Sequence, residues 1–249
     1  MEDIAHSIEC LNTFSKNHRG WLFRGQSNPT WLLRPTLERA AARCEVERCE
    51  FERAVFIDFQ RQASSFLPRL PHEESTLEWL AVMQHYGAPT RLLDFTYSFW
   101  IAVYFAYEFS DSECSIWAVD PKSLARESTK QTDKQLLNSI EKANNSTDKI
   151  FYCTPFYLNE RLGIQQGEFL FTPHSTADFH NVFVQNKKTH FKLTIPKHLF
   201  AKIRELLNEF NCNSRTLMPG IDGYSRYFQN PTIPFNLPPR KAGVSMVWV

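Results

Sequence analysis

Polar side chains that could take part in chemistry gather in one short stretch of the chain, residues 78–96. The stretch is otherwise largely apolar and reads EWLAVMQHYGAPTRLLDFT. Polar groups in such surroundings are costly to bury unless each one finds a partner. The stretch therefore indicates either a structural polar network or a ligand site. Its candidate residues are Gln84, His85, Thr90, Arg91, Asp94 and Thr96.

In a strand, alternate side chains point to the same face, and this determines which of these residues could act together. If residues 90–95 form a strand, Thr90, Asp94 and Thr96 share one face, and Arg91 points to the other. A buried Asp–Arg or Asp–Thr network that orders the core explains the pattern as well as a ligand site does.

Arg24 and Gly25 form a second candidate pair at the end of the apolar segment 21–25. An arginine at a strand end can hold a phosphate or a carboxylate through two hydrogen bonds. A glycine beside it lets a ligand lie against bare backbone. The alternative is a structural ion pair at a strand end.

A third polar segment, QQGE at residues 165–168, opens the alternating segment 165–171. In a strand, Gln166 and Glu168 share a face, and Gly167 leaves room for a close approach. An exposed strand edge would give the same pattern. Arg161 lies shortly before this segment and could pair with Glu168 or with Asp94.

Several common chemistries lack their sequence motifs. The chain has no nucleophile elbow, no P-loop and no Gly-x-Gly-x-x-Gly motif. Histidines such as His85 and His174 lack metal-ligand spacing, and no two of the six cysteines form a C-x-x-C pair. We therefore expect no metal site and reduced thiols.

Charge and hydropathy argue against nucleic-acid-binding, membrane and secreted proteins. The net charge of +1 gives no electrostatic case for nucleic acid as the main partner. No apolar run approaches the roughly 20 residues of a membrane span, and the N-terminal residues do not resemble a signal peptide. These features favour a cytoplasmic protein without a membrane partner.

Helices and strands alternate along the predicted chain. Periodicity and capping signals predict helices over residues 4–14, 45–66, 75–86, 98–109 and 197–210. Short apolar or alternating runs predict strands over residues 21–25, 90–95, 115–119, 151–156, 165–171, 182–184 and 190–195. Ser75 and Glu78 have capping-box spacing, and Gly87 suits a helix C-terminus.

The remaining segments are irregular in this prediction. The polar residues 126–149 are typical of a mobile loop or insertion, residues 216–223 of a turn, and the tail from residue 231 of irregular chain. We expect one α+β domain over residues 1–249, with a mixed β-sheet, flanking helices and a core over about 20–224.

Several of these segments together resemble the FRG-domain family, which is named for its Phe-Arg-Gly motif. The resemblance spans about residues 20–224. It rests on FRG at residues 23–25, QHYGAPTRLLDFT at 84–96, YFA at 104–106, QG at 166–167 and MPGIDG at 218–223.

A second resemblance, to ADP-ribosyltransferases, implies a fold and a chemistry. In those enzymes an arginine strand, a Ser/Thr strand and a Gln/Glu-x-Glu strand frame the nicotinamide nucleotide of NAD. The resemblance implies that Arg24 and Gly25 bind NAD and that Glu168 bonds the ribose 2′-hydroxyl, with Gln166 and Arg24 as further catalytic groups. The remaining NAD contacts that it implies are Gln26, Gln84, His85, Thr90, Arg91, Asp94, Thr96 and Arg161.

The sequence also departs from that pattern. LLDFT at residues 92–96 replaces the Ser-Thr-Ser motif, so that Asp94 and Thr96 would stand in for it. The FRG-like pattern features Gln166 and Gly167 rather than Glu168.

Two functions remain open at this point. One is an ADP-ribosyltransferase-like enzyme that cleaves the nicotinamide–ribose bond of NAD, by transfer to a macromolecular target or by hydrolysis, with a fixed carboxylate stabilising the developing positive charge. The other is a non-catalytic module that binds a nucleotide or a protein, with Arg24, Arg91 and Arg161 as anion contacts. Both require three distant segments to line one cleft.

Overall fold

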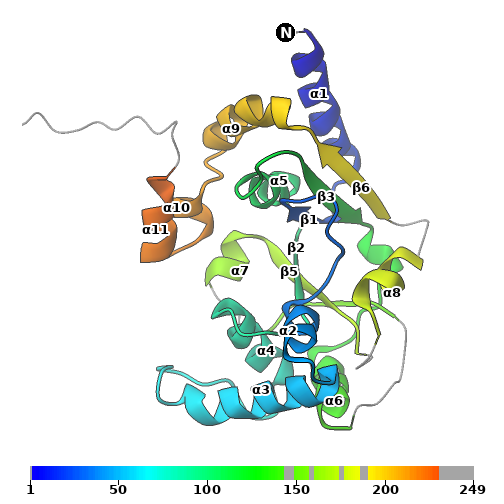
Figure 1. The fold of residues 1–249 in the computed structure, drawn as a ribbon, viewed down its shortest axis with the longest axis vertical. Coiled ribbons are helices and arrows are strands. Elements are labelled where there is room, and N and C mark those ends of the chain that lie inside the picture. Colours follow the sequence, from blue (N-terminus) through cyan, green and yellow to red (C-terminus); the bar gives the residue numbers. More distant parts are fainter. Residues whose placement is uncertain (1, 143–148, 157–159, 174–176, 186–189, 230–249) are drawn as a thin grey trace, which may run out of the picture.

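The computed structural model describes residues 2–142, 149–156, 160–173, 177–185 and 190–229 of the chain. Its centre is one sheet of six strands in the order β4-β5-β2-β1-β3-β6 (Figure 1). The strands are β1 (Leu22–Gln26), β2 (Leu93–Thr96), β3 (Cys114–Val119), β4 (Phe151–Cys153), β5 (Gly167–Phe171) and β6 (His190–Ile195).

The predicted α+β class is confirmed, but the expectation of a mixed sheet is wrong. All five pairings between the described strands are antiparallel, and one isolated parallel bridge joins Ala125 to Phe151. The helices here join strands that pair antiparallel. Between the neighbours β1 and β2, for example, the chain passes through α2 (Thr36–Cys44), α3 (Arg48–Ala63) and α4 (Thr76–His85).

Two groups of helices cover one face of the sheet at its two ends (Figure 1). Residues that face each other across antiparallel strands share a face, so the register puts Phe23, Thr96, Gly167 and Phe169 on the same side. Phe23 packs with α1 (Glu2–Asn17), α5 (Phe99–Tyr107) and α9 (Phe200–Glu209), which follows the 3-10 turn η2 (Lys197–Leu199). Phe169 packs with α3, α4 and α6 (Thr129–Lys142). Thr96 and Gly167 lie between the two groups.

The opposite face has its own apolar cluster. Leu22, Phe95 and Leu170 pack there against Phe179 and Phe183 of α8 (Phe179–Gln185). The remaining described helices are short: η1 (Pro121–Ser123), α7 (Glu160–Ile164), α10 (Ser214–Leu217) and α11 (Ile221–Tyr227).

Most predicted elements are confirmed, with boundaries shifted by a few residues. The helices expected over 4–14, 45–66, 75–86, 98–109 and 197–210 correspond to α1, α3, α4, α5 and η2 with α9. Gly87 follows α4 with a φ of 81°, the left-handed conformation that favours glycine. The Ser75 side chain makes no capping hydrogen bond. Instead the Asp133 carboxylate of α6 accepts from the Leu77 amide at 2.7 Å, so a distant helix supplies the cap.

Three local predictions are wrong. Residues 129–142 form the helix α6 rather than a loop, because Leu136 and Ile140 lie one turn apart and pack in the core. Residues 182–184 belong to the helix α8, in which Phe179 and Phe183 are also four residues apart. The turn expected over 216–223 contains the end of α10 and the start of α11. Residues 143–148, and the tail from residue 231, lie outside the described residues.

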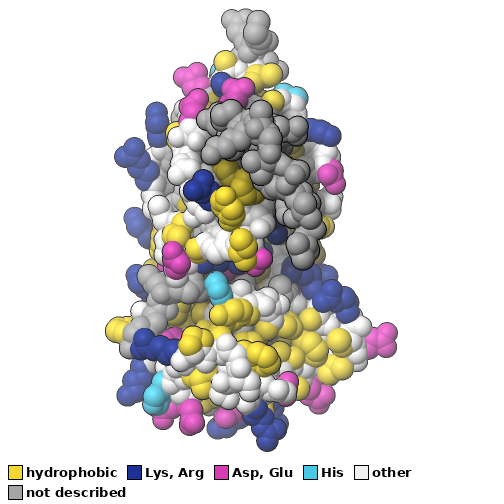
Figure 2. Space-filling view, turned by 90° about the vertical axis from the view of Figure 1, so that its left-hand side faces the viewer, with side chains coloured by type: hydrophobic (Ala, Val, Ile, Leu, Met, Phe, Trp, Pro, Cys, Tyr) yellow, Lys and Arg dark blue, Asp and Glu magenta, His cyan; other side chains and the backbone are white. Residues whose placement is uncertain are grey.

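Large apolar side chains are also exposed on the surface. Phe66 is 80% exposed and Tyr86 is 63% exposed. Figure 2 shows hydrophobic side chains gathered in the lower half of one face of the molecule. In the described part of the chain, no helix combines the length and apolar character that a membrane crossing requires.

Candidate functional site

A cleft of about 720 Å³ lies on the sheet beside helix α5. Strands β1 and β2 pair at one position, Phe23 with Thr96, whereas β1 pairs with β3 along its whole length. The cleft lies where β1 and β2 diverge. Its lining residues come from β1 and the segment after it, from β2, from the start of α2, from α5, and from α7 to β5.

Arg24 lies where β1 faces β2. Its Nη1 atom donates a hydrogen bond of 2.7 Å to the Asp94 carbonyl oxygen and lies 3.9 Å from the Asp94 Oδ2 atom. Its Nε atom is buried and has no hydrogen-bond partner among the described residues. Burial lowers the pKa of the Arg24 guanidinium, and the charge of Asp94 acts in the opposite direction. One buried donor of this guanidinium is therefore unsatisfied within the described part of the chain.

The Asp94 carboxylate is oriented by two other polar residues of the central stretch. Gln84 Nε2 donates to Asp94 Oδ2 at 2.7 Å, and Thr90 Oγ1 donates to Gln84 Oε1 at 2.5 Å. Thr90 is fully buried and does not line the cleft, whereas the Asp94 side chain is 53% exposed and does. Thr90 and Gln84 thus hold the carboxylate in place rather than facing a ligand themselves.

Thr96 also lines the cleft, but its hydroxyl is occupied. Thr96 Oγ1 donates to the Gln165 carbonyl oxygen at 2.6 Å and accepts from the Ser98 amide at 3.0 Å. These bonds fix the turn from β2 into α5, where Ser98 is the N-cap. Asp94 and Thr96 share a face of β2, as predicted, but Thr90 and Arg91 precede the strand.

Gly25 is required by helix packing. A Cβ atom at this position would lie 2.0 Å from the Ala102 carbonyl oxygen and 2.6 Å from the Ala106 amide nitrogen, both in α5. Gly167 is similarly crowded, since a Cβ there would lie 2.3 Å from Leu162 Cδ1. Both glycines line the cleft, but the close approach that they permit is to helices of the chain itself.

Further cleft residues come from segments outside the central stretch and β1. Three more arginines line it, Arg34, Arg39 and Arg161, and Arg39 Nη1 donates to the Arg34 carbonyl oxygen at 2.8 Å. Apolar contact surface comes from Trp31, Leu32, Phe105 and Phe109. Trp31 is 55% exposed and follows the polar residues 27–30, a pattern that could have indicated it. Arg34 and Arg39 carry no comparable signal, because single arginines near a helix start are common.

Gln26 helps to hold the segment that carries Trp31 and Arg34. Its Oε1 atom accepts from Trp117 Nε1 at 2.8 Å, and its Nε2 atom donates to the Leu32 carbonyl oxygen at 3.2 Å. Leu33 in the same segment donates its amide to His180 Nδ1 at 3.3 Å. The wall of the cleft formed by residues 27–34 is therefore tied to the opposite face of the sheet.

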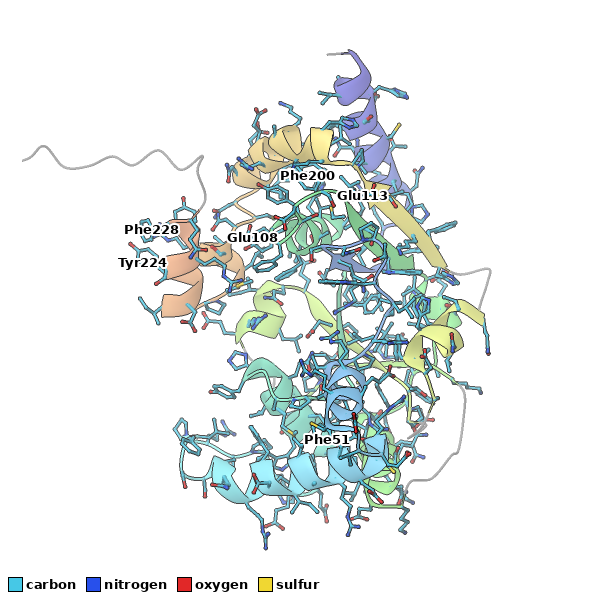
Figure 3. The ribbon with its side chains drawn as sticks, viewed as in Figure 1. Phe51, Glu108, Glu113, Phe200, Tyr224 and Phe228 are labelled. Carbon is cyan, nitrogen blue, oxygen red and sulfur yellow. The ribbon has the colours of Figure 1, made fainter. Side chains whose placement is uncertain are left out.

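Helix α11 contacts Phe109, one of the residues that line the cleft. The Arg226 guanidinium lies 5.0 Å from the centre of the Phe109 ring, so the two side chains form a cation–π contact. Glu108 lies at the same end of α5 and extends toward α10 and α11 (Figure 3). Burial raises the pKa of the Glu108 carboxyl, and Arg226 and Arg204 oppose that shift.

Arg91 lies outside the cleft, in a buried network. Its side chain forms a two-pronged ion pair with Glu52 of α3, with an Nε to Oε1 distance of 2.7 Å. It also donates to Ser139 Oγ of α6 at 2.8 Å and to the Thr172 carbonyl oxygen at 3.3 Å. Arg91 is 5% exposed. Its contacts are those of a structural polar network.

Glu168 also lies outside the cleft lining. The register pairs Glu168 with Phe95, so its side chain points to the face opposite Thr96 and Gly167. It accepts a hydrogen bond from Thr154 Oγ1 at 2.7 Å and is 4% exposed. Burial raises the pKa of the Glu168 carboxyl, while Thr154 and the charge of Arg126 lower it.

The other predicted site residues occupy peripheral positions. Gln166 precedes β5 with a φ of 49°, is exposed, and does not line the cleft. His85 is an exposed residue at the end of α4 and is also absent from the lining. Arg161 does line it, but forms no ion pair with Asp94 or Glu168. His174 lies outside the described residues.

The cleft therefore combines basic and apolar groups. Four arginines and one acidic residue, Asp94, line it within the described part of the chain. Across those same residues, no group of three His, Cys, Asp or Glu side chains could hold a metal ion. Such a lining suits an organic anion that has an apolar or aromatic part.

Comparison with family models gives a match over part of the chain. Residues 19–114 match the model of the FRG domain. The matched range contains Arg24, Asp94 and the polar residues that orient Asp94, whereas Arg161, Gln165 and Gly167 lie beyond it. No curated protein and no solved structure gives a significant match.

Proposed function

With the FRG domain at residues 19–114 as the premise, we propose that the chain binds a nucleotide in the cleft on β1 and β2, and that NAD is the first ligand to test. The observation that carries the proposal is the position of Arg24. Its guanidinium lies in the cleft, beside Asp94, with a buried Nε donor that has no partner among the described residues.

A phosphate group would satisfy this donor. A buried donor without a partner costs about 1–3 kcal/mol, and a guanidinium binds phosphate oxygens through paired hydrogen bonds. Trp31, Phe105 and Phe109 supply aromatic surface for a base or a nicotinamide ring. The volume of about 720 Å³ falls in the range of sites for small organic ligands.

Isothermal titration calorimetry with NAD tests the binding. We expect saturable binding that weakens at least tenfold in Arg24→Gln. Arg61→Gln is the matched control, because it removes the same charge from an exposed position of α3 that does not line the cleft. An affinity for NAD that is equal in Arg24→Gln and the control would contradict the role of Arg24, and the absence of any heat of binding with NAD or with any other nucleotide tested would contradict the proposal.

An ADP-ribosyltransferase-like activity would extend this function and would depend on Asp94. Cleavage breaks the bond between the nicotinamide nitrogen and the ribose C1′ atom, and the electron pair leaves with nicotinamide. The positive charge that develops on the sugar is stabilised by a fixed carboxylate nearby. Water or a nucleophile of a macromolecular target then bonds to C1′ and loses its proton to solvent. Asp94, held by Gln84, is the acidic side chain that lines the cleft.

Release of free nicotinamide from NAD separates the enzyme from a non-catalytic module. For the enzyme, we expect release that is lost in Asp94→Asn and retained in Glu168→Gln, because Glu168 points to the other face of the sheet. Saturable binding without release supports the module, in which Arg24 and Arg161 act as anion contacts. Release that is lost in Glu168→Gln but kept in Asp94→Asn would contradict the role given to Asp94.

A further inference from the structure

The charges around the cleft exceed those that NAD can neutralise. The Asp94 carboxylate lies 3.9 Å from Arg24 and compensates that guanidinium in part. Arg34, Arg39 and Arg161 also line the cleft, and none of them has an acidic partner within 4.0 Å among the described residues. Four arginines and one aspartate leave a formal charge of +3 around the cleft.

The extra arginines come from two separate parts of the chain. Arg39 lies in the first half of α2, where its bond to the Arg34 carbonyl oxygen brings these two residues of the same wall together. Its charge is close enough to Arg24 to lower the pKa of that guanidinium further. Arg161 lies in α7. Like charges that face one ligand site repel each other until an anion binds.

NAD carries too little negative charge to balance the positive charge around the cleft. Its pyrophosphate carries two negative charges, and its nicotinamide ring carries a positive one. A phosphate monoester adds about 1.5–2 negative charges at neutral pH. Its three oxygens can also accept hydrogen bonds from a guanidinium of the same wall.

We infer that the cleft selects nucleotides that carry a third phosphate group over NAD, and that Arg39 is the residue that recognises that group. The inference rests on the proposed function, since it names the class of nucleotide bound at the same site. Two ligands share this chemistry. NADP differs from NAD by a phosphate on the adenosine ribose, and ATP differs from ADP by a phosphate at the end of the chain.

Calorimetric titrations of NAD, NADP, ADP and ATP at one pH and ionic strength, in the presence of a chelator, test the inference. We expect NADP to bind at least tenfold more tightly than NAD, or ATP at least tenfold more tightly than ADP. Which pair shows the gain identifies the position of the third phosphate. The gain should shrink as NaCl is added, because salt screens the charges of partly exposed groups.

Variants of α2 assign the effect to Arg39. Arg39→Gln should lower the affinity for the preferred ligand about tenfold. It should lower the affinity for the matching nucleotide without the third phosphate by less. The ratio of the two affinities should therefore fall. Arg43→Gln is the matched control, because it is an exposed arginine one turn along the same helix that does not line the cleft. Thermal unfolding of both variants should follow that of the wild type.

The outcomes separate this inference from the proposed function. Equal affinities within both ligand pairs, together with saturable NAD binding, would overturn the selection and leave nucleotide binding intact. A ratio that persists in Arg39→Gln would overturn the role of Arg39. If none of the four nucleotides binds, the proposed function itself fails.

Discussion

A methyl group at position 25 would collide with the backbone of α5, because the Cβ atom would lie 2.0 Å from the Ala102 carbonyl oxygen. Overpacking of this kind typically costs about 1–3 kcal/mol, and backbone atoms cannot rotate away as a side chain can. We expect Gly25→Ala to lower the free energy of unfolding by at least about 2 kcal/mol, measured by urea denaturation. Gly163→Ala is the control, because a Cβ there meets nothing within 4 Å. Equal stability of the two variants would contradict the packing role of Gly25.

Glu168 allows a prediction about pH at the same scale. Burial raises the pKa of this carboxyl above that of the unfolded chain. The native state therefore holds its proton more tightly, and it loses stability relative to the unfolded state as the pH rises through the native pKa. Glutamine has no such cost and can still accept from Thr154. We expect the stability of Glu168→Gln relative to the wild type to increase between about pH 4 and pH 7.

Urea denaturation at a series of pH values measures this difference. Glu141→Gln serves as the control, because Glu141 is exposed on α6. A relative stability of Glu168→Gln that falls as the pH rises would show that the carboxylate form is favoured in the native state, and the cost of burial would then be outweighed by its partners.

At the scale of elements, the segment between β1 and α2 depends on one histidine of α8. His180 Nδ1 accepts a hydrogen bond from the Leu33 amide, and a protonated imidazole cannot accept it. Burial lowers the pKa of His180, with Lys192, Arg34 and His190 acting in the same direction and Asp178 opposing them. The stabilisation is therefore present above the unfolded pKa of about 6.5 and is lost as the pH falls through the native value.

We expect nucleotide affinity and unfolding free energy to decline together below about pH 6.5, because this segment carries Trp31 and Arg34 of the cleft. His180→Gln should show a weaker pH dependence of both quantities. His6→Gln, at an exposed position of α1, is the control. A pH dependence that is unchanged in His180→Gln would show that another group is responsible.

At the scale of the whole molecule, Arg91 joins α3, through its ion pair with Glu52, to α6 and to the end of β5 through further hydrogen bonds. Removal of one partner of a buried pair leaves an uncompensated charge and costs about 3–5 kcal/mol, whereas apolar replacement of both partners often costs little. We expect Arg91→Met to be strongly destabilised and the double variant Arg91→Met/Glu52→Leu to recover most of that loss in urea denaturation.

NAD binding by the double variant decides between the two roles of Arg91. Retained affinity is expected, because Arg91 does not line the cleft. Affinity that is lost in a stable double variant would mean that Arg91 acts on the ligand site after all.

The helices and strands could be predicted from the sequence where neighbouring residues determine them. Helical periodicity located α3 and α5, and Gly87 marked the end of α4. The face of Glu168 could not be predicted, because a positive φ at Gln166 places that residue outside the strand and β5 begins only at Gly167. The cap of α4 was likewise missed, because Asp133 is 56 residues away from Leu77 in the chain.

The candidate site was predicted in part for the same reason. Arg24 and Asp94 lie in segments with recognisable polar residues, and the structure brings them together. Arg39 and Phe109 became cleft residues through the tertiary arrangement of α2 and α5 around the sheet, which no local pattern encodes. The polar residues at 84–96 serve both of the roles considered for them. Asp94 faces the cleft, as expected for a ligand site, and Arg91 belongs to a buried structural network.

The single paired position between β1 and β2 has a mechanical consequence. β1 pairs with β3 at five positions and β2 pairs with β5 at four, so the strands within each half of the sheet are joined by regular ladders. The junction between the halves holds few ladder hydrogen bonds, and it can act as a hinge at low cost in backbone bonding. A ligand that bridges Arg24 and Asp94 to Arg161 would then draw the two halves toward each other.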